Sequence, residues 1–517
     1  MSEEETKHHR VWWGLLVFGL LLHLSSIASS DYGLDTHLHL AAIESNEDGT
    51  PNLEWGDVRP EDPSASNPDD VQMLERGWWQ ILELYPSWLL PFAAFLPMLV
   101  LIGLVLGATK GKPHLAALIS LHPSFIFATG RLYPESTVAL AVAGVILASL
   151  YLFKLRGWKL IQWLLLAVAS IHLLVLVKGL SAMVGWILVG LLLAWIALDR
   201  LVPQFRNYSR NPMMALSVSI PLVLVAMIAA SFTTAGSLTS IRTHPVQWTF
   251  SLVVAFFDGF GLYLLVGMCC WPFLSEGVAQ VKQSNDNTSV FLLVFVASGT
   301  LLMSMWIASL WVYEAGRWNL PLWENMILMG NNGRYLTALV FPLLLLLNRS
   351  IRDKPLVIGK PIMLALLLVL PLSMLAGMHG QTMWTDDAAE SFSNDVVDGE
   401  DFLYIDDEAL AMHWLYTFRL ELDPEGDRNI TGHWRAPDSN WEVELEGLVM
   451  ENRGDLSNVA YLVIAPEIDV EALLASKRWL QELLHSSMVE AIGRSIEPSD
   501  VSEGFKHVHS RVVMEGP

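Results

Sequence analysis

Eleven apolar runs dominate this 517-residue chain, and most of them are long enough to cross a lipid bilayer. A membrane-spanning helix needs about 20 mainly apolar residues, because the hydrocarbon core is about 30 Å thick. Charged residues make up only 16% of the chain, against about 25% in soluble domains. The sequence therefore predicts a polytopic α-helical membrane protein with about 11 transmembrane helices. The predicted spans are 11–29, 86–108, 113–130, 135–153, 160–177, 180–198, 213–233, 256–274, 289–311, 335–348 and 359–377.

Basic residues cluster in alternate connections between these runs. Because cytoplasmic connections are enriched in Lys and Arg, this alternation predicts a cytoplasmic N-terminus and, with eleven spans, an outer C-terminus. The chain is thus expected in the cell membrane as a multi-pass protein. The first run favours an uncleaved anchor, with a cleaved signal peptide as the alternative. The basic residues that set this orientation are Lys7, Arg10, Lys110, Lys112, Lys154, Arg156, Lys159, Arg200, Arg206, Arg210, Lys282, Arg349, Arg352 and Lys354.

Acidic residues concentrate in two segments that the topology places outside the cell. Residues 31–85 hold 13 acidic and 2 basic side chains, and residues 379–517 hold 29 acidic and 9 basic ones. A strongly acidic face argues against nucleic acid as a partner, although a salty habitat explains the composition equally well.

Two domains are expected from this pattern. Residues 1–378 form the transmembrane domain, which includes the first outer loop 31–85, and residues 379–517 form a soluble extracytoplasmic α/β domain. In the latter, strand-like runs at 402–405 and 459–464 alternate with helical ones at 408–422 and 470–484.

The first outer loop opens with a group of ionisable residues, Asp31, Asp35, His37 and His39. A carboxylate at the mouth of a membrane domain can act as a general base or bind a divalent cation, for which Asp31 and Asp35 are the candidates. The alternative is that Asp31 caps a solvated helix. The two histidines bring no third ligand at metal-site spacing, so the sequence predicts no zinc site.

Further charges lie on the predicted outer side, where charge near hydrocarbon is costly and usually functional. Arg131, Tyr133 and Glu135 form a tight hairpin, in which an Arg–Glu pair closing the turn is the structural alternative. Lys178 stands between two spans, where its side chain can also reach the membrane surface. Asp258 opens a predicted span, and Arg334 and Tyr335 precede another. An outer Arg or Lys can neutralise a phosphate that arrives from the lipid.

In their order and sidedness, these features resemble the GT-C superfamily of integral-membrane glycosyltransferases. The nearest branch is that of the dolichyl-phosphate-mannose-protein mannosyltransferases and the lipid A aminoarabinose transferases. The family's acidic pair, Asp-Glu, reads Asp35-Thr36 here, so the role of the Glu is missing or moved. The matching segments are Gly33-Leu-Asp35-Thr-His37-Leu-His39-Leu, Gly130-Arg131-Leu-Tyr133-Pro-Glu135, Lys178-Gly179 and Arg334-Tyr335-Leu-Thr-Ala-Leu-Val-Phe-Pro342.

This resemblance implies a sugar donor linked to polyprenyl phosphate and an acceptor hydroxyl on a protein or lipid. It implies catalytic roles for Asp35 and Glu135, with Asp35 as the general base of an inverting displacement. Arg131, Lys178 or Arg334 would stabilise the departing phosphate. The residues expected to bind substrate are Asp31, His37, His39, Arg131, Tyr133, Lys178, Asp258, Arg334 and Tyr335.

Two other functions fit a polytopic chain. A transporter or flippase would use intramembrane charges as substrate sites, and it typically carries an internal repeat, which this sequence lacks. A non-catalytic membrane assembly protein would act through its C-terminal domain, and its outer charges would be structural.

Overall fold

The computed structural model describes residues 3–37, 39–40, 43, 77–153, 157–233, 236–273, 275, 277, 279, 287–317, 320–350, 358–378, 380, 383–393, 397–405, 411–422, 431–435, 449–450, 454–455 and 459–465. The chain divides into two compact units. The first comprises Met1–Tyr32 and Arg76–Gln381, and the second comprises Gly33–Glu75 and Thr382–Pro517. The domain bounds 1–378 and 379–517 expected from the sequence stay a prediction.

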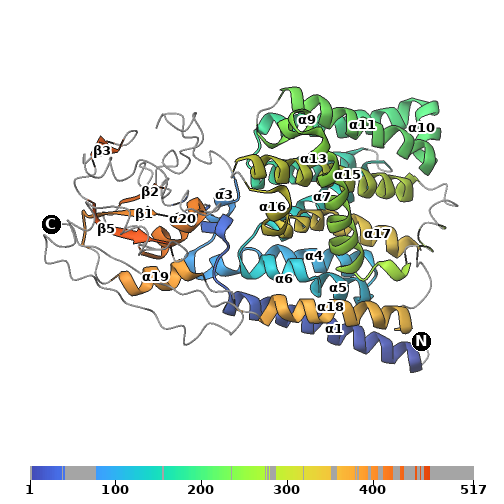
Figure 1. The fold of residues 1–517 in the computed structure, drawn as a ribbon. Helices are drawn as coiled ribbons and strands as arrows, with labels where there is room; N and C mark the ends of the chain where they lie inside the picture. Colours follow the sequence, from blue (N-terminus) through green and yellow to red (C-terminus); the bar gives the residue numbers. More distant parts are fainter. Residues whose placement is uncertain are drawn as a thin grey trace, which may run out of the picture. The chain divides into compact units, whose positions relative to one another are not determined.

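Helices make up nearly all of the described part of the first unit (Figure 1). In chain order they are α1 (Glu3–Ser29), α3 (Trp79–Leu82), η4 (Ser87–Phe92), α4 (Phe95–Ala108), α5 (Pro113–Ser120), α6 (Pro123–Gly130), α7 (Glu135–Leu152), α8 (Trp158–Val177), α9 (Ala182–Leu201), α10 (Pro203–Arg210), α11 (Pro212–Thr233), η5 (Ser237–Thr239), α12 (Ser240–Thr243), α13 (Pro245–Phe256), η6 (Phe257–Val266), η7 (Trp271–Phe273), α15 (Asn287–Arg317), α16 (Leu322–Leu328), η8 (Gly330–Leu339), α17 (Val340–Ser350) and α18 (Lys360–Met378).

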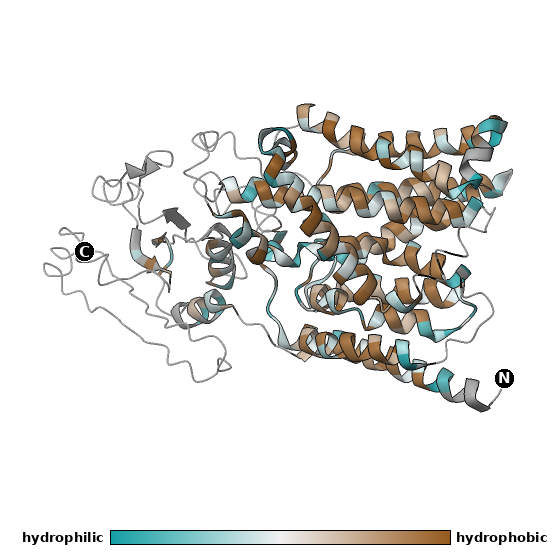
Figure 2. Cartoon of the chain, turned by 45° about the vertical axis from the view of Figure 1, so that its right-hand side comes forward, coloured by the Kyte–Doolittle hydropathy of each residue, from teal (hydrophilic) through white to brown (hydrophobic). Residues whose placement is uncertain are grey.

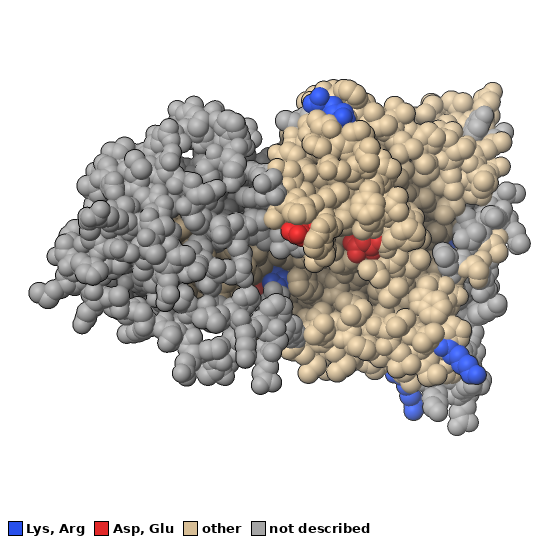
Figure 3. Space-filling view, in the orientation of Figure 1, with Lys and Arg blue, Asp and Glu red and all other residues tan. Residues whose placement is uncertain are grey.

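Among the described residues, eight helical segments are long and apolar enough to cross a membrane. Hydrophobic residues run along these helices, while hydrophilic ones gather near their ends (Figure 2). On the face seen in Figure 3, the described part of the first unit presents few charged side chains. The chain is therefore a multi-pass membrane protein, as predicted. The eight segments are His8–Ser29, Glu135–Leu152, Trp158–Val177, Ala182–Leu201, Pro212–Thr233, Pro245–Val266, Asn287–Gly316 and Lys360–Met378.

The predicted count of eleven spans is not confirmed, because three of the apolar runs do not form one continuous helix of spanning length among the described residues. The run 113–130 forms two short helices, α5 and α6, which are separated at Leu121 and His122. Pro123 lacks a backbone N–H and disfavours helix at the preceding residue, so α5 ends and α6 begins there. Likewise, η4 with its internal Pro91 precedes α4 in the run 86–108.

The third interrupted run is 335–348, where the 3-10 segment η8 leads into α17. The predicted span 256–274 lies closer to the N-terminus, at Pro245–Val266, and its second half is the π-helical segment η6. Asp258 therefore sits within this span rather than at its start. π-Helical turns are rare in proteins, and many of those that occur are at functional sites.

Helix α1 packs against α5, α6 and α18 in the first unit. The approach of α1 to α6 depends on Gly130, because a Cβ at this position would lie 2.8 Å from the carbonyl oxygen of Ser26. This contact between backbones brings the end of α1 close to the hairpin at residues 131–134.

In the second unit, strands β1 (Asp401–Ile405) and β5 (Val459–Ile464) lie where the sequence predicts strands. They form a parallel sheet of order β2-β1-β5 with β2 (Thr431–Arg435). Residues 402–405 of the central strand are all buried, which is typical of a parallel sheet covered on both faces. The predicted helix 470–484 lies outside the described residues. The other described elements of this unit are α19 (Trp384–Phe392), α20 (Ala411–Leu422), β3 (Val449–Met450) and β4 (Gly454–Asp455).

Candidate functional site

A buried ion pair joins two segments of the first unit that are far apart in the sequence. The Nε of Arg334, in η8, donates to Oε1 of Glu135, at the first turn of α7, over 2.7 Å. Both side chains are about 95% buried. A buried charge is costly unless it is paired, so each residue needs the other. The Glu135 Oε2 atom is also buried and has no hydrogen-bond partner among the described residues.

Aromatic rings surround the Arg334 guanidinium. Its Cζ lies 4.6 Å from the centre of the Tyr133 ring and 5.0 Å from that of Tyr335. The Tyr335 ring also lies 4.8 Å from the Nζ of Lys178, in the turn between α8 and α9. The face of an aromatic ring attracts a cation, so the two tyrosines help to hold these charges together. Five residues that the sequence singled out are thus assembled from four segments.

The hairpin that supplies Tyr133 is fixed by its backbone. Leu132 has a φ of 58°, which is unusual for a residue with a side chain. Its carbonyl oxygen accepts a hydrogen bond of 2.9 Å from the indole Nε1 of the buried Trp78. This contact stabilises a turn after which Tyr133 and Glu135 both contact Arg334.

Arg131 follows α6 and is also buried. Its Cζ lies 4.6 Å from the centre of the Phe127 ring. Burial lowers the pKa of the Arg131 guanidinium, while Tyr133 and Asp31 act in the opposite direction and Arg334 adds to the decrease. The carboxylate of Asp31, two residues after the end of α1, therefore favours the charged form of Arg131.

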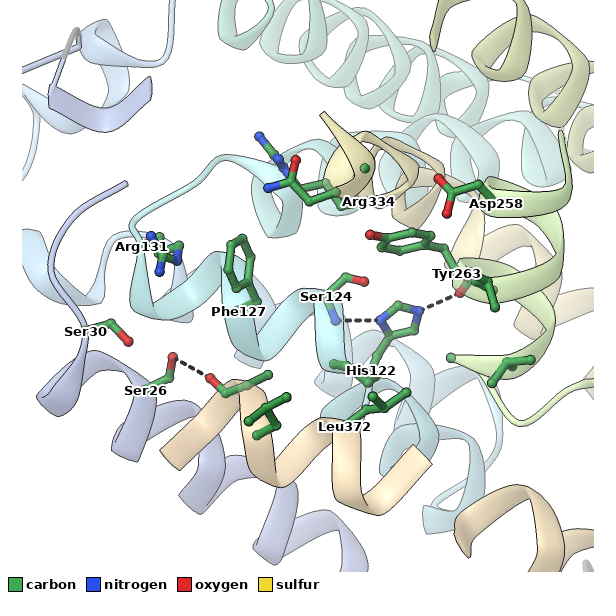
Figure 4. A pocket seen from close by; sticks show the side chains of 18 residues that line it. Ser26, Ser30, His122, Ser124, Phe127, Arg131, Asp258, Tyr263, Arg334 and Leu372 are labelled. Atoms are coloured by element: carbon green, nitrogen blue, oxygen red, sulfur yellow. Dashed lines mark hydrogen bonds between the residues drawn. The ribbon is translucent and has the colours of Figure 1, made fainter. Parts of the chain in front are cut away.

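A cavity of about 550 Å³ lies beside the two arginines. In Figure 4, Arg131 lies toward one end, Asp258 and Tyr263 lie toward the other, and Arg334 is between them. Phe127, Leu262, Val266, Leu372, Leu375 and Ala376 make much of the lining apolar. Within the described lining, the charged side chains are the two arginines and Asp258, whereas Glu135 contributes none of the lining.

Asp258 and Tyr263 come from the π-helical segment η6. A Cβ at Gly333 would overlap the Tyr263 ring and Oδ2 of Asp258, so only glycine allows η8 to approach η6 this closely. The Asp258 Oδ2 atom is buried without a hydrogen-bond partner among the described residues. The Asp258 side chain also lines the cavity, where a carboxylate can accept a hydrogen bond from a ligand.

His122 is a cavity residue that the sequence did not identify as functional. Its Nδ1 accepts a hydrogen bond from the Ser124 backbone N–H at 3.2 Å, and its Nε2 donates to the Tyr263 carbonyl oxygen at 2.8 Å. The ring therefore caps α6 and ties it to η6 (Figure 4). A polar residue before a proline within an apolar run was the available signal for this role.

The remaining predicted site residues, Asp35, His37 and His39, belong to the second unit. Residues 34–37 form a short helical turn, and the Thr36 N–H donates to the Gly33 carbonyl oxygen at 2.8 Å. The role of Asp35 as a general base stays a prediction.

Solved structures with this fold were found, while no protein-family model matches the chain and no curated protein sequence is significantly similar to it. The crystal structure of ArnT from Cupriavidus metallidurans bound to undecaprenyl phosphate has 13% sequence identity and a TM-score of 0.50. That alignment covers 98% of each chain. The apo structure of the same protein gives the same identity and coverage with a TM-score of 0.43. ArnT is a lipid A aminoarabinose transferase of the GT-C superfamily, so the predicted resemblance is confirmed for the fold.

Proposed function

We propose that this chain is a membrane glycosyltransferase that moves a sugar from polyprenyl phosphate to an acceptor hydroxyl on the outer face of the membrane. The observation that carries this proposal is the pair of buried arginines, Arg131 and Arg334, at a largely apolar cavity. A guanidinium binds phosphate oxygens through strong, charge-assisted hydrogen bonds. The apolar lining suits the first isoprene units of the lipid. ArnT, whose fold is similar, has been crystallised with undecaprenyl phosphate.

The reaction is a single displacement. The acceptor oxygen attacks the anomeric carbon, the bond from that carbon to the phosphate oxygen breaks, and polyprenyl phosphate leaves with the electron pair. Asp35 takes the acceptor proton, and Arg131 and Arg334 stabilise the negative charge that develops on the phosphate. Glu135 acts through Arg334, because its Oε1 already accepts from Nε of that residue. We therefore assign Glu135 as a positioning residue.

A binding measurement tests the phosphate site. The full chain in nanodiscs is titrated with undecaprenyl phosphate, and Arg131→Gln is expected to weaken binding by about 1.5–3 kcal/mol. Lys360→Gln is the control, because Lys360 is exposed at the start of α18 and is not among the described residues that line the cavity. Equal affinity in wild type and Arg131→Gln would contradict the proposal.

A transfer assay tests the chemistry. With a polyprenyl-phosphate sugar and membrane extract as the source of acceptors, Asp35→Asn should keep donor binding and lose about 100-fold or more in transfer. Donor binding in wild type without any transfer would instead favour a transporter of lipid-linked sugars.

A further inference from the structure

Three side chains with metal-ligand chemistry meet in the second unit. They are His37, which follows α1, Asp386 on α19 and Glu421 on α20. One ligand atom from each lies within 4.8 Å of the others. None of the three is among the described residues that line the cavity.

The orientation of His37 sets it apart from a chance neighbour of two carboxylates. The imidazole is 1% exposed, and its Nδ1 lies 3.1 Å from the Gly33 carbonyl oxygen. A carbonyl oxygen can only accept, so Nδ1 carries a hydrogen, and in the neutral ring Nε2 then presents its lone pair. This is the arrangement that fixes the tautomer of metal-ligating histidines.

The distances in the cluster fit ligands around an ion better than a hydrogen bond. His37 Nε2 lies 3.9 Å from Oε1 of Glu421, which is too long for a hydrogen bond. Two ligands about 2.1 Å from a tetrahedral ion are roughly 3.4 Å apart. Glu421 is 42% exposed, so its carboxylate can move by the difference.

The helices that carry the two carboxylates are held together. The hydroxyls of Thr385 on α19 and Thr417 on α20 are fully buried and lie 2.6 Å apart. The pair fixes Asp386, the next residue along α19, relative to the helix that bears Glu421. Two carboxylates that face one another repel, and a divalent cation between them and a neutral imidazole balances their charge.

We propose that His37, Asp386 and Glu421 bind a divalent transition metal ion, with at least one coordination position left for water or a ligand. The mixture of imidazole and carboxylate donors suits Zn²⁺ or Mn²⁺ better than Mg²⁺ or Ca²⁺, which prefer oxygen ligands alone. Sequence spacing did not reveal this site, because Asp386 and Glu421 come from the other end of the chain and His39 is not one of the three ligands.

The test measures metal binding directly. The full chain in nanodiscs is stripped with a chelator and titrated separately with ZnCl₂, MnCl₂, MgCl₂ and CaCl₂, and the bound metal per chain is determined by mass spectrometry of the elements. One Zn²⁺ or Mn²⁺ per chain is expected. His37→Gln, Asp386→Asn and Glu421→Gln should each weaken binding about tenfold or more.

Matched controls lie close in the sequence to two of the three ligands, His37 and Asp386. His39→Gln and Glu390→Gln should bind the metal as wild type does, because neither residue belongs to the described cluster. The melting temperature of each metal-free variant is compared with that of the metal-free wild type to check that the variant folds. If His37→Gln does not fold, the metal affinity of Glu421→Gln decides the test. Absence of a bound ion, binding of Mg²⁺ or Ca²⁺ alone, or unchanged affinity in Glu421→Gln would overturn the proposal.

Discussion

Arg334 and Glu135 lie 199 positions apart in the sequence, and in the structure their Nε and Oε1 atoms form a 2.7 Å ion pair inside the first unit. The pair has two consequences that can be separated. It stabilises the contact between η8 and α7, and it fixes the direction of a guanidinium at the cavity.

Neutral substitutions separate these two effects. Arg334→Gln leaves Glu135 buried without its cation, so it should destabilise the protein by about 3–5 kcal/mol. The double variant Arg334→Gln with Glu135→Gln removes both charges and should lie within about 1–2 kcal/mol of wild type. Its affinity for undecaprenyl phosphate should nevertheless remain low, because the guanidinium is gone. Unfolding in denaturant and lipid titration measure the two quantities, and recovery of binding in the double variant would show that Arg334 does not contact the phosphate.

Gly333 provides a second test of the packing at this site. Gly333→Ala should destabilise the unit by about 1–3 kcal/mol, because the new methyl group meets the Tyr263 ring and the Asp258 carboxylate. Gly330→Ala is the matched control, since a Cβ at Gly330 has no atom within 4 Å among the described residues. Thermal unfolding of both variants makes the comparison. A similar melting temperature for the two would mean that η8 does not lie as close to η6 as described.

Much of the membrane region could be predicted from apolar runs alone. Spans such as Trp158–Val177 and Lys360–Met378 match their predictions closely, because nothing within them competes with a continuous helix. The predicted count is not confirmed where hydrophobicity hides a local break in a helix. Pro123 divides the run 113–130, yet the residues around it are apolar enough to count as one span. Hydropathy averages over such a break and does not register it.

The sequence alone points to several residues of the candidate site, but it does not show which of them contact one another. Isolated charges such as Lys178 and Arg334 stand out in the sequence because charge is costly near hydrocarbon. The ion pair between Arg334 and Glu135, by contrast, depends on which helices are neighbours in the fold. This cannot be read from a single sequence. Glu421 was missed for the same reason. It is one of many acidic residues in the C-terminal region, and its proximity to His37 appears only in the folded chain.

Cysteine labelling tests the orientation that the basic connections predict. Glu390→Cys should react with a membrane-impermeant maleimide on intact cells, and Arg210→Cys should react only after the membrane is permeabilised. Both positions are exposed in the structure. The native Cys269 and Cys270 are buried, so wild type should give a low background. The opposite labelling pattern would reverse the orientation and place the second unit in the cytoplasm.

Asp258 distinguishes recognition of the sugar from recognition of the lipid phosphate. Its side chain lines the cavity, where a sugar hydroxyl could donate to the carboxylate. Asp258→Asn keeps the size of the side chain and removes the charge, so the affinity for a polyprenyl-phosphate sugar should fall by about 1.5–3 kcal/mol.

Bare undecaprenyl phosphate serves as the internal control for this variant, because it carries no sugar hydroxyl and its affinity should stay the same or increase slightly. An increase is expected because a carboxylate repels the phosphate across the cavity. Titrations with both lipids, at matched amounts of folded protein, measure the difference. If Asp258→Asn lowers the two affinities equally, its effect is on the shape of the cavity, and the sugar is recognised elsewhere.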